Sequence, residues 1–154
     1  NSSFANEIFS NLLEKGLIED FSEHDMISRE PRLSDGGRLD FLLENNNGES
    51  VFIEVKSCTH VENGIAKFPD RPTNRGRRHL GNLISISQGK GESHLVFVVQ
   101  RPDVDIFKPF REVDPEFAKL LEKANDANVG IHALSIEFNP PGLYLEKENI
   151  PVIL

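Results

Sequence analysis

The chain has 154 residues, of which 38% are hydrophobic and 27% charged, and its formal net charge at pH 7 is -8. These values are ordinary for a soluble globular domain and exclude a collagen-like or wholly disordered chain. The acidic balance argues against a uniformly basic coat for nucleic acid, although a local basic patch remains open. No apolar run approaches the ~18 residues that cross a bilayer, so we expect no membrane partner.

The single cysteine and the amino-terminal residues indicate in which cell compartment the protein is expected. Cys58 has no second cysteine with which to form an intrachain disulfide. The first residues do not follow the basic, apolar, small-residue order of a secretory signal. We therefore expect a reducing, cytoplasmic setting. No repeat or boundary divides the sequence, which predicts a single domain over residues 1–154.

The first half of the chain predicts a helix, a hairpin and a second helix. Apolar residues recur at helical spacing from Phe4 until Gly16, which suits a helix end. Residues 38–44 and 51–57 predict two strands, and the Asn/Gly-rich turn between them predicts a β-hairpin. A further helix is expected at about 73–87, where four residues form an apolar stripe: Gly76, Leu80, Leu83 and Ile84.

The second half alternates strands with a helix. Residues 94–99 lack polar alternation, which is typical of a strand covered on both faces in a parallel sheet. A short solvent-facing strand is expected at 103–106, a helix capped by Asp114 follows, and 131–138 predicts another strand. Residues 140–142 should break the chain before a short apolar tail. This order predicts an α/β fold with a mixed sheet flanked by helices and right-handed crossovers.

The predicted hairpin brings three chemically useful residues together. Glu54 and Lys56 are two apart on one strand, so their side chains project to one face. If the hairpin is symmetric about Asn47, Asp40 lies across from Glu54. Two carboxylates roughly 5 Å apart repel each other unless a proton or a cation intervenes. The set predicts a Mg²⁺ site for phosphodiester hydrolysis, with Lys56 orienting the attacking water.

A structural explanation of the same three residues stays open at this point. A lone Glu-x-Lys is common on surface strands, and Lys56 could simply neutralise Glu54 and Asp40 in an ion cluster. The apolar residues around Glu54 place these charges at the edge of a core, where they need a partner or a metal.

A local basic segment follows the hairpin. Residues 67–79 contain five basic residues and one acid, a balance of 5 − 1 = +4 without His79, in an otherwise acidic chain. On the expected helix, Arg75, Arg78 and His79 share one face. This pattern favours phosphate binding, with a solvated helix face as the alternative. Further contacts are expected from Lys67, Arg71, Arg77 and Arg101, with Asp70, Thr73 and Gln100 as additional candidates. An alternative interpretation of Gln100 and Arg101 is that they only begin the loop after the preceding strand, without a role in binding.

The sequence resembles the sugar fermentation stimulation protein family over residues 6–144. Four motifs occur in the order and spacing of that family, although each alone would be weak. They are Arg38-Leu39-Asp40-Phe41-Leu42-Leu43, then Ile53-Glu54-Val55-Lys56-Ser57, then Phe68-Pro69-Asp70 with Thr73, Arg75-Gly76 and His79-Leu80, and finally Gln100-Arg101.

The resemblance implies a restriction-endonuclease-like PD-(D/E)XK core. Asp40 would stand for the motif aspartate, Glu54 and Lys56 for the (D/E)XK pair, and the Val55 carbonyl for an extra ligand of Mg²⁺ or Mn²⁺. Some related nucleases also carry an acidic ligand on the first helix, for which Glu7 is available. The family has an N-terminal OB-like domain to which nothing in this sequence corresponds.

The resemblance also implies a function. Family members are described as binding DNA without strong sequence preference, so DNA is the expected partner and a metal-dependent nuclease of DNA or RNA the expected activity. The alternative is a catalytically silent nuclease fold that acts as a regulatory DNA-binding module in sugar (maltose) metabolism. A homodimer is one expected assembly, because many nuclease-fold enzymes pair to cut two strands.

Overall fold

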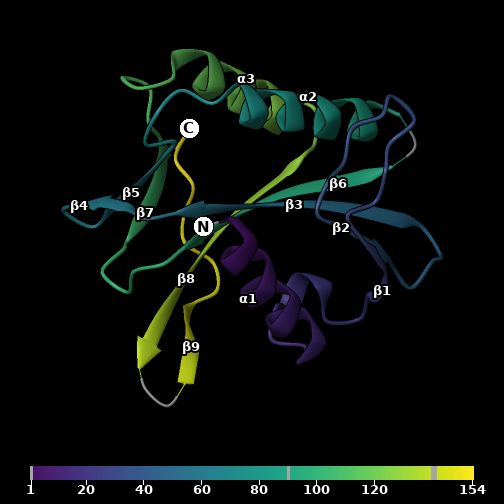
Figure 1. The fold of residues 1–154 in the computed structure, drawn as a ribbon, viewed down its shortest axis with the longest axis horizontal. Coiled ribbons are helices and arrows are strands. Elements are labelled where there is room, and N and C mark those ends of the chain that lie inside the picture. Colours follow the sequence, from purple (N-terminus) through teal and green to yellow (C-terminus); the bar gives the residue numbers. More distant parts are fainter. Residues whose placement is uncertain (1, 90, 140–141) are drawn as a thin grey trace.

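The computed structural model describes residues 2–89, 91–139 and 142–154 as a curled central sheet with helices on both faces (Figure 1). Helix α1 lies on one face, whereas α2 and α3 run side by side on the other. The helical elements are α1 (Ser2–Glu14), the 3-10 turn η1 (Glu19–Phe21), α2 (Asn74–Gln88) and α3 (Pro115–Asp126). The strands are β1 (Asp25–Arg29), β2 (Phe41–Glu44), β3 (Ser50–Cys58), β4 (His60–Glu62), β5 (Ile65–Phe68), β6 (Glu92–Val99), β7 (Ile106–Pro109), β8 (Gly130–Asn139) and β9 (Gly142–Lys147).

The central sheet has the strand order β1-β2-β3-β6-β8-β9. Strands β1, β2 and β3 pair antiparallel, β3, β6 and β8 are parallel, and β9 returns antiparallel to β8. Helix α2 lies in the connection from β3 to β6, and α3 in the connection from β6 to β8, as parallel neighbours require. The mixed α/β sheet flanked by helices is therefore confirmed. A smaller sheet of order β4-β5-β7 lies beside it.

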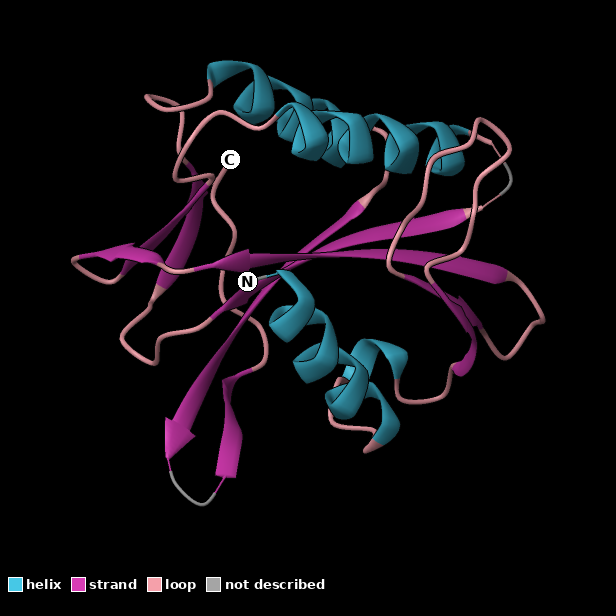
Figure 2. Ribbon diagram, viewed as in Figure 1, coloured by secondary structure: helices cyan, strands magenta, loops and turns pink. Residues whose placement is uncertain are grey.

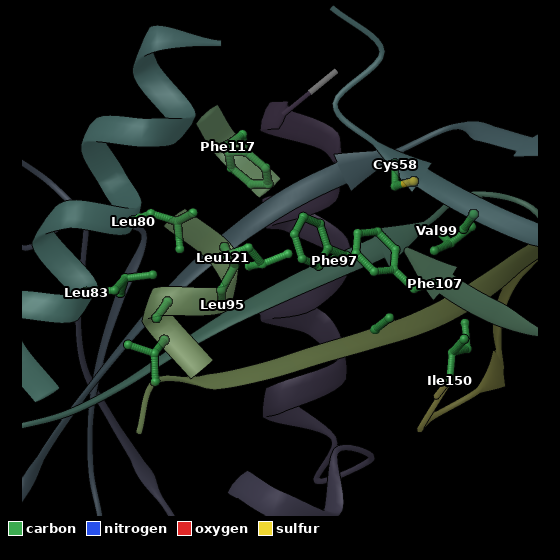
Figure 3. Packing of buried hydrophobic residues seen from close by; sticks show 14 of the residues in the cluster. Cys58, Leu80, Leu83, Leu95, Phe97, Val99, Phe107, Phe117, Leu121 and Ile150 are labelled. Atoms are coloured by element: carbon green, nitrogen blue, oxygen red, sulfur yellow. The ribbon is translucent and has the colours of Figure 1, made fainter. Parts of the chain in front are cut away.

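Two apolar clusters hold the layers together. Between the sheet and the α2–α3 layer, Phe97 stacks on Phe107 with ring centroids 4.2 Å apart, and Phe117 of α3 joins them through Phe68 (Figure 3). On the other face, α1 buries Phe9 against the β2–β3 hairpin. Because apolar side chains cover both faces of β6, its sequence shows the continuous apolar run that predicts a central parallel strand.

The amino-terminal ends of α2 and α3 share one buried carboxylate. Asp114 accepts a hydrogen bond from the Phe117 backbone N–H and so caps α3, as expected. It also accepts from the Thr73 N–H and from the Arg77 guanidinium. Burial opposes the charge of Asp114, but these donors outweigh it and lower the pKa of its carboxyl. The shared carboxylate fixes where α2 begins relative to α3, and hence where its next turns face.

Several strands differ from the sequence-based expectation (Figure 2). Residues 103–106 do not form a solvent-facing strand: Val104 is fully buried, and the strand begins only at Ile106. Residues 142–147 are not a tail but strand β9, paired with β8; Pro140 and Pro141 lie outside the described residues. Strands β1, β4 and β5 were not expected. Strand β1 is short and largely exposed, so no apolar pattern marks it. Strands β4 and β5 form a hairpin around the Asn63-Gly64 turn, a local signal that the sequence-based prediction missed.

None of the helices in the described ranges is long and apolar enough to cross a membrane.

Candidate active site

The register of the β2–β3 hairpin places Asp40 beside Glu54. Phe41 pairs with Ile53, so the next step along the ladder brings Asp40 opposite Glu54, and the Asp40 N–H donates to the Ile53 carbonyl at 3.2 Å. This is the register that symmetry about the Asn/Gly turn predicts. Lys56 lies two residues further on the same face of β3, which carries its side chain to Glu54.

The Asp40 carboxylate is held from both sides. One oxygen accepts a hydrogen bond from the Asn6 side chain of α1 at 2.9 Å, and the other accepts from the Val55 backbone N–H at 2.8 Å. Burial and the nearby negative charge of Glu54 raise the pKa of Asp40 to about 7, because these two hydrogen bonds compensate only in part. A negative charge on Asp40 is therefore costly near neutral pH, and a cation between the carboxylates would relieve that cost.

The pKa of Glu54 is shifted in the opposite direction to that of Asp40. Its side chain is only 3% exposed, but one carboxylate oxygen lies 2.9 Å from the Lys56 ammonium and 2.6 Å from His79 Nδ1. Burial would raise the pKa of Glu54, yet the hydrogen bond from His79 and the charge of Lys56 outweigh it and lower the pKa. The other oxygen, Oε1, is buried and has no hydrogen-bond partner. Glu54 is thus ionised with one oxygen still able to accept a ligand.

His79 lies inside the site and not on the outer face of α2. Helical spacing predicts that His79 binds phosphate together with Arg75 and Arg78. Its ring is instead buried, with Nδ1 2.8 Å from Lys56 and 2.6 Å from Glu54. A position next to Gly76 and Leu80 on the apolar side of the helix explains this inward orientation. His79 therefore donates from Nδ1 to the Glu54 carboxylate and orients it.

The backbone of Val55 presents its carbonyl to the same edge. In an extended strand, the N–H and C=O of one residue point to the same side. The Val55 N–H donates to Asp40, so its carbonyl also points to the side of β3 where β2 has ended. This orientation agrees with the carbonyl ligand that the family resemblance implies.

Two adjoining clefts surround these residues. One of about 380 Å³ is lined by Asn6, Asp40, Glu54, Val55 and Lys56 among others. The second, of about 500 Å³, shares Asp40 and Glu54 and extends along α2. Arg75 lines both clefts and Arg78 the second, and both arginines are exposed. The structure thus brings two predicted phosphate-binding arginines to the carboxylates.

The remaining predicted basic residues do not line these clefts. Lys67 lies 5.0 Å from the centre of the Phe110 ring, Arg77 pairs with Asp114, and Arg101 pairs with Asp103. Arg71 is exposed near the start of α2.

The three additional candidate site residues, like the basic residues above, do not line the two clefts. Gln100 donates to the Ser57 hydroxyl, Thr73 caps α2 by accepting from the Gly76 N–H, and Asp70 is exposed outside both clefts.

Asn6 was not predicted from the sequence. The candidate acidic ligand of the first helix was Glu7, but Glu7 is exposed and pairs with Arg29 at 2.7 Å. Asn6 instead contacts Asp40, and its own Oδ1 is buried without a hydrogen-bond partner. No sequence signal distinguishes the two, because the rotation of α1 against the sheet decides which one faces the hairpin.

The donor set fits a hard divalent cation. Asp40, Glu54 Oε1, the Val55 carbonyl and Asn6 Oδ1 are all oxygens, and two of them are buried without a partner. Oxygen ligands are what Mg²⁺ and Mn²⁺ prefer, and Mg²⁺ keeps several waters besides. Within the described ranges no three His, Cys, Asp or Glu side chains form a metal cluster, so a cation here would need the carbonyl oxygens and water in addition to the two carboxylates.

The sheet order, the two crossover helices and the Asp…Glu-x-Lys hairpin together define a domain with the PD-(D/E)XK nuclease-like fold. A family model described as "Sugar fermentation stimulation protein RE domain" matches residues 3–142. The chain belongs to this sugar fermentation stimulation protein family.

Individual relatives agree with this assignment. A sugar fermentation stimulation protein homolog of Shewanella loihica is 37% identical over 148 residues, which are 96% of this chain and 63% of the relative. The homolog of Pyrococcus furiosus is 38% identical over 94% of this chain and 62% of its own length. The solved structure of Pyrococcus furiosus SfsA in complex with Ca²⁺ matches with a TM-score of 0.93 and 32% identity, covering all of this chain and 66% of that one. The chain thus spans just under two thirds of these relatives.

Proposed function

We propose that this domain binds DNA without strong sequence preference and that its hairpin site binds Mg²⁺ or Mn²⁺ for phosphodiester hydrolysis. The observation that supports the proposal best is the meeting of Asp40, Glu54 and Lys56 in one cleft that Arg75 also lines. The Ca²⁺ named for the solved relative is consistent with a hard-cation site in this family.

Each side chain has a distinct role in this proposal. Asp40, Glu54 and the Val55 carbonyl would hold the cation, which supplies charge neutralisation at the phosphate and a more acidic bound water. Lys56 would orient that water, since its ammonium is fixed by the Glu54 carboxylate. Arg75 and Arg78 would contact the phosphates that flank the scissile bond.

A cleavage assay tests the catalytic half of the proposal. Plasmid, single-stranded DNA and RNA are each incubated with the protein in Mg²⁺, Mn²⁺ or EDTA. We expect metal-dependent cleavage that falls by about 100-fold in Lys56→Ala, because the water loses its orienting donor. Lys119→Ala, an exposed lysine of α3, is the matched control and should cleave normally.

A different result separates the two functions. If DNA is retained but never cut, and Lys56→Ala retains it equally, the domain is a silent nuclease fold that serves as a DNA-binding module. If neither cleavage nor retention of any nucleic acid is observed, both functions are refuted.

A salt titration of DNA binding tests the role of α2. Replacing Arg75 and Arg78 by alanine removes two phosphate contacts, so the slope of log affinity against log salt should become shallower by about 2. The weakening should be similar for unrelated DNA sequences, because phosphate contacts carry no sequence information. The double variant Lys119→Ala/Lys123→Ala on α3 removes the same charge elsewhere and should leave the slope nearly unchanged. An unaltered slope in the arginine variant would exclude this face as the contact.

A further inference from the structure

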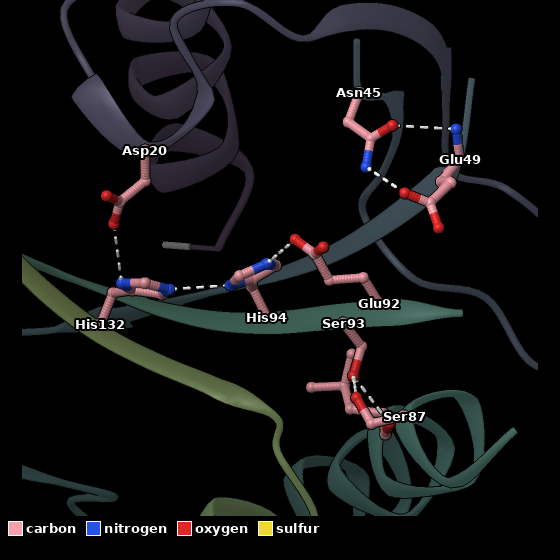
Figure 4. Close-up of polar contacts among 9 residues, drawn as sticks. Asp20, Asn45, Glu49, Ser87, Glu92, Ser93, His94 and His132 are labelled. Atoms are coloured by element: carbon pink, nitrogen blue, oxygen red, sulfur yellow. Dashed lines mark hydrogen bonds and ion pairs between the residues drawn. The ribbon is translucent and has the colours of Figure 1, made fainter. Parts of the chain in front are cut away.

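A pair of histidines lies on neighbouring strands, apart from the carboxylate site. His94 is near the start of β6 and His132 near the start of β8, and His94 Nδ1 is 2.8 Å from His132 Nε2 (Figure 4). Gly130, which pairs with His94 in the ladder, makes this approach feasible. A Cβ at Gly130 would overlap His94 Nδ1 and lie 2.8 Å from His132 Nε2.

A carboxylate lies near the outer nitrogen of each ring. Glu92 Oε2 is 2.7 Å from His94 Nε2, and Asp20 Oδ2 of η1 is 3.5 Å from His132 Nδ1 (Figure 4). Histidines that ligate metals are held in this way, with the outer N–H directed at a carboxylate and the inner lone pair directed at the ion. When both outer nitrogens carry their protons, the two inner lone pairs face each other and require a proton or a metal ion between them.

The surroundings favour an ion in that position. The Phe21 ring packs edge-on against His94 and His132 and limits rotation of both imidazoles. The side chains remain 14% and 23% exposed, so an ion can reach them from solvent.

From this geometry we infer a binding site for one divalent transition-metal ion of the Zn²⁺, Ni²⁺ or Cu²⁺ class between His94 and His132. Metal–imidazole bonds of about 2.0–2.1 Å hold two nitrogens about 3.3 Å apart at a tetrahedral ion. The rings therefore need to separate by only about half an ångström. No third ligating side chain converges on this point among the described residues, so water fills the remaining positions. The ion would link β6 to β8 and, through Asp20, to η1.

Thermal unfolding with added metal tests this site independently of DNA binding and cleavage. We expect an excess of Zn²⁺ or Ni²⁺ to raise the Tm of the wild-type protein by about 5 °C, because the ion binds only the folded chain. His132→Gln should reduce this rise, because only the contribution of the carboxylate site then remains. His60→Gln, whose ring pairs with Glu62 at the surface of β4, should keep it. The response to Ca²⁺, which prefers oxygen ligands, should be the same in both variants.

An NMR measurement on the wild-type protein covers the case in which His132→Gln does not fold. Sub-stoichiometric Ni²⁺ should broaden the ring signals of His94 and His132 before those of His60 and His79. Absence of a metal-induced Tm rise in the wild type, an equal rise in His132→Gln, or broadening that spares the pair would each overturn the inference.

Discussion

Replacing Asp40 by asparagine is expected to stabilise the protein at pH 8 and to remove its affinity for divalent cations. The folded-state pKa of about 7 against an ordinary value of 3.8 means that the ionised carboxylate costs up to about 4 kcal/mol. The introduced amide carries no charge, still accepts from the Val55 N–H, and can pair with Asn6 if the Asn6 amide turns its unpartnered oxygen to it. We expect a gain of about 2–4 kcal/mol in the free energy of unfolding.

The gain should depend on pH in a definite direction. The folded chain binds a proton at Asp40 more tightly than the unfolded chain does. The stability from that proton is therefore fully present below pH 3.8 and is lost as the pH rises through about 7. Chemical denaturation at several pH values should accordingly show a small difference between Asp40→Asn and wild type at pH 4 and the full difference at pH 8.

The control is Asp126→Asn, an exposed charge on α3 that should change stability little at either pH. Isothermal titration with Mn²⁺ should show binding to wild type and to this control, but not to Asp40→Asn. If Asp40→Asn is less stable than wild type at pH 8, the ionised Asp40 carboxylate does not destabilise the folded protein and the prediction is wrong.

Replacing Glu54 by glutamine is expected to have the opposite effect on stability. Its carboxylate is the counter-charge for the half-buried Lys56 ammonium and the partner of the buried His79. Removing one member of a buried ion pair typically costs 3–5 kcal/mol, because the other charge remains without compensation. Relief of the repulsion with Asp40 offsets part of this cost. We therefore expect a loss of about 3 kcal/mol at pH 7, together with loss of Mn²⁺ binding.

The pH dependence again has a predictable sign. The folded-state pKa of Glu54 lies below its ordinary value of 4.5. Its contribution is therefore present above pH 4.5 and is lost as the pH falls through the lower folded-state pKa. Denaturation curves for Glu54→Gln and wild type should converge below pH 4.5. Glu14→Gln, at an exposed position near the end of α1, provides the comparison and should match wild type throughout. A Glu54→Gln variant as stable as wild type at pH 7 would show that the ion cluster does not support the fold.

Asp40→Asn is expected to stabilise the protein, whereas Glu54→Gln is expected to destabilise it. This contrast shows how much of the site could be predicted from the sequence. The hairpin register follows from the Asn/Gly turn and the alternation of the strands, so the meeting of Asp40, Glu54 and Lys56 was predictable from local pattern. Which of the two acids carries the negative charge was not predictable from local pattern. It depends on Lys56 and the buried His79 as partners of one acid, and on a single amide from Asn6 as the side-chain partner of the other.

The same distinction separates the strands that were predicted from those that were missed. Strand β6 was evident because a strand buried on both faces has a continuous apolar sequence. Strands β1 and β9 form the two edges of the central sheet. Edge strands pair on one side only and keep exposed residues, so their sequences carry little of the pattern that marks a core strand.

The amino-acid sequence by itself determined the mixed α/β fold and the acid–acid–lysine hairpin, because turn chemistry and strand periodicity act over a few residues. Its four motifs carried the resemblance to the family. Only the tertiary structure decided that His79 faces inward, that Asn6 and not Glu7 reaches Asp40, and that His94 and His132 meet across two strands. Each of these contacts joins segments more than 20 residues apart. Their geometry depends on how helices and strands rotate against one another in the packed core, a property that no local sequence pattern encodes.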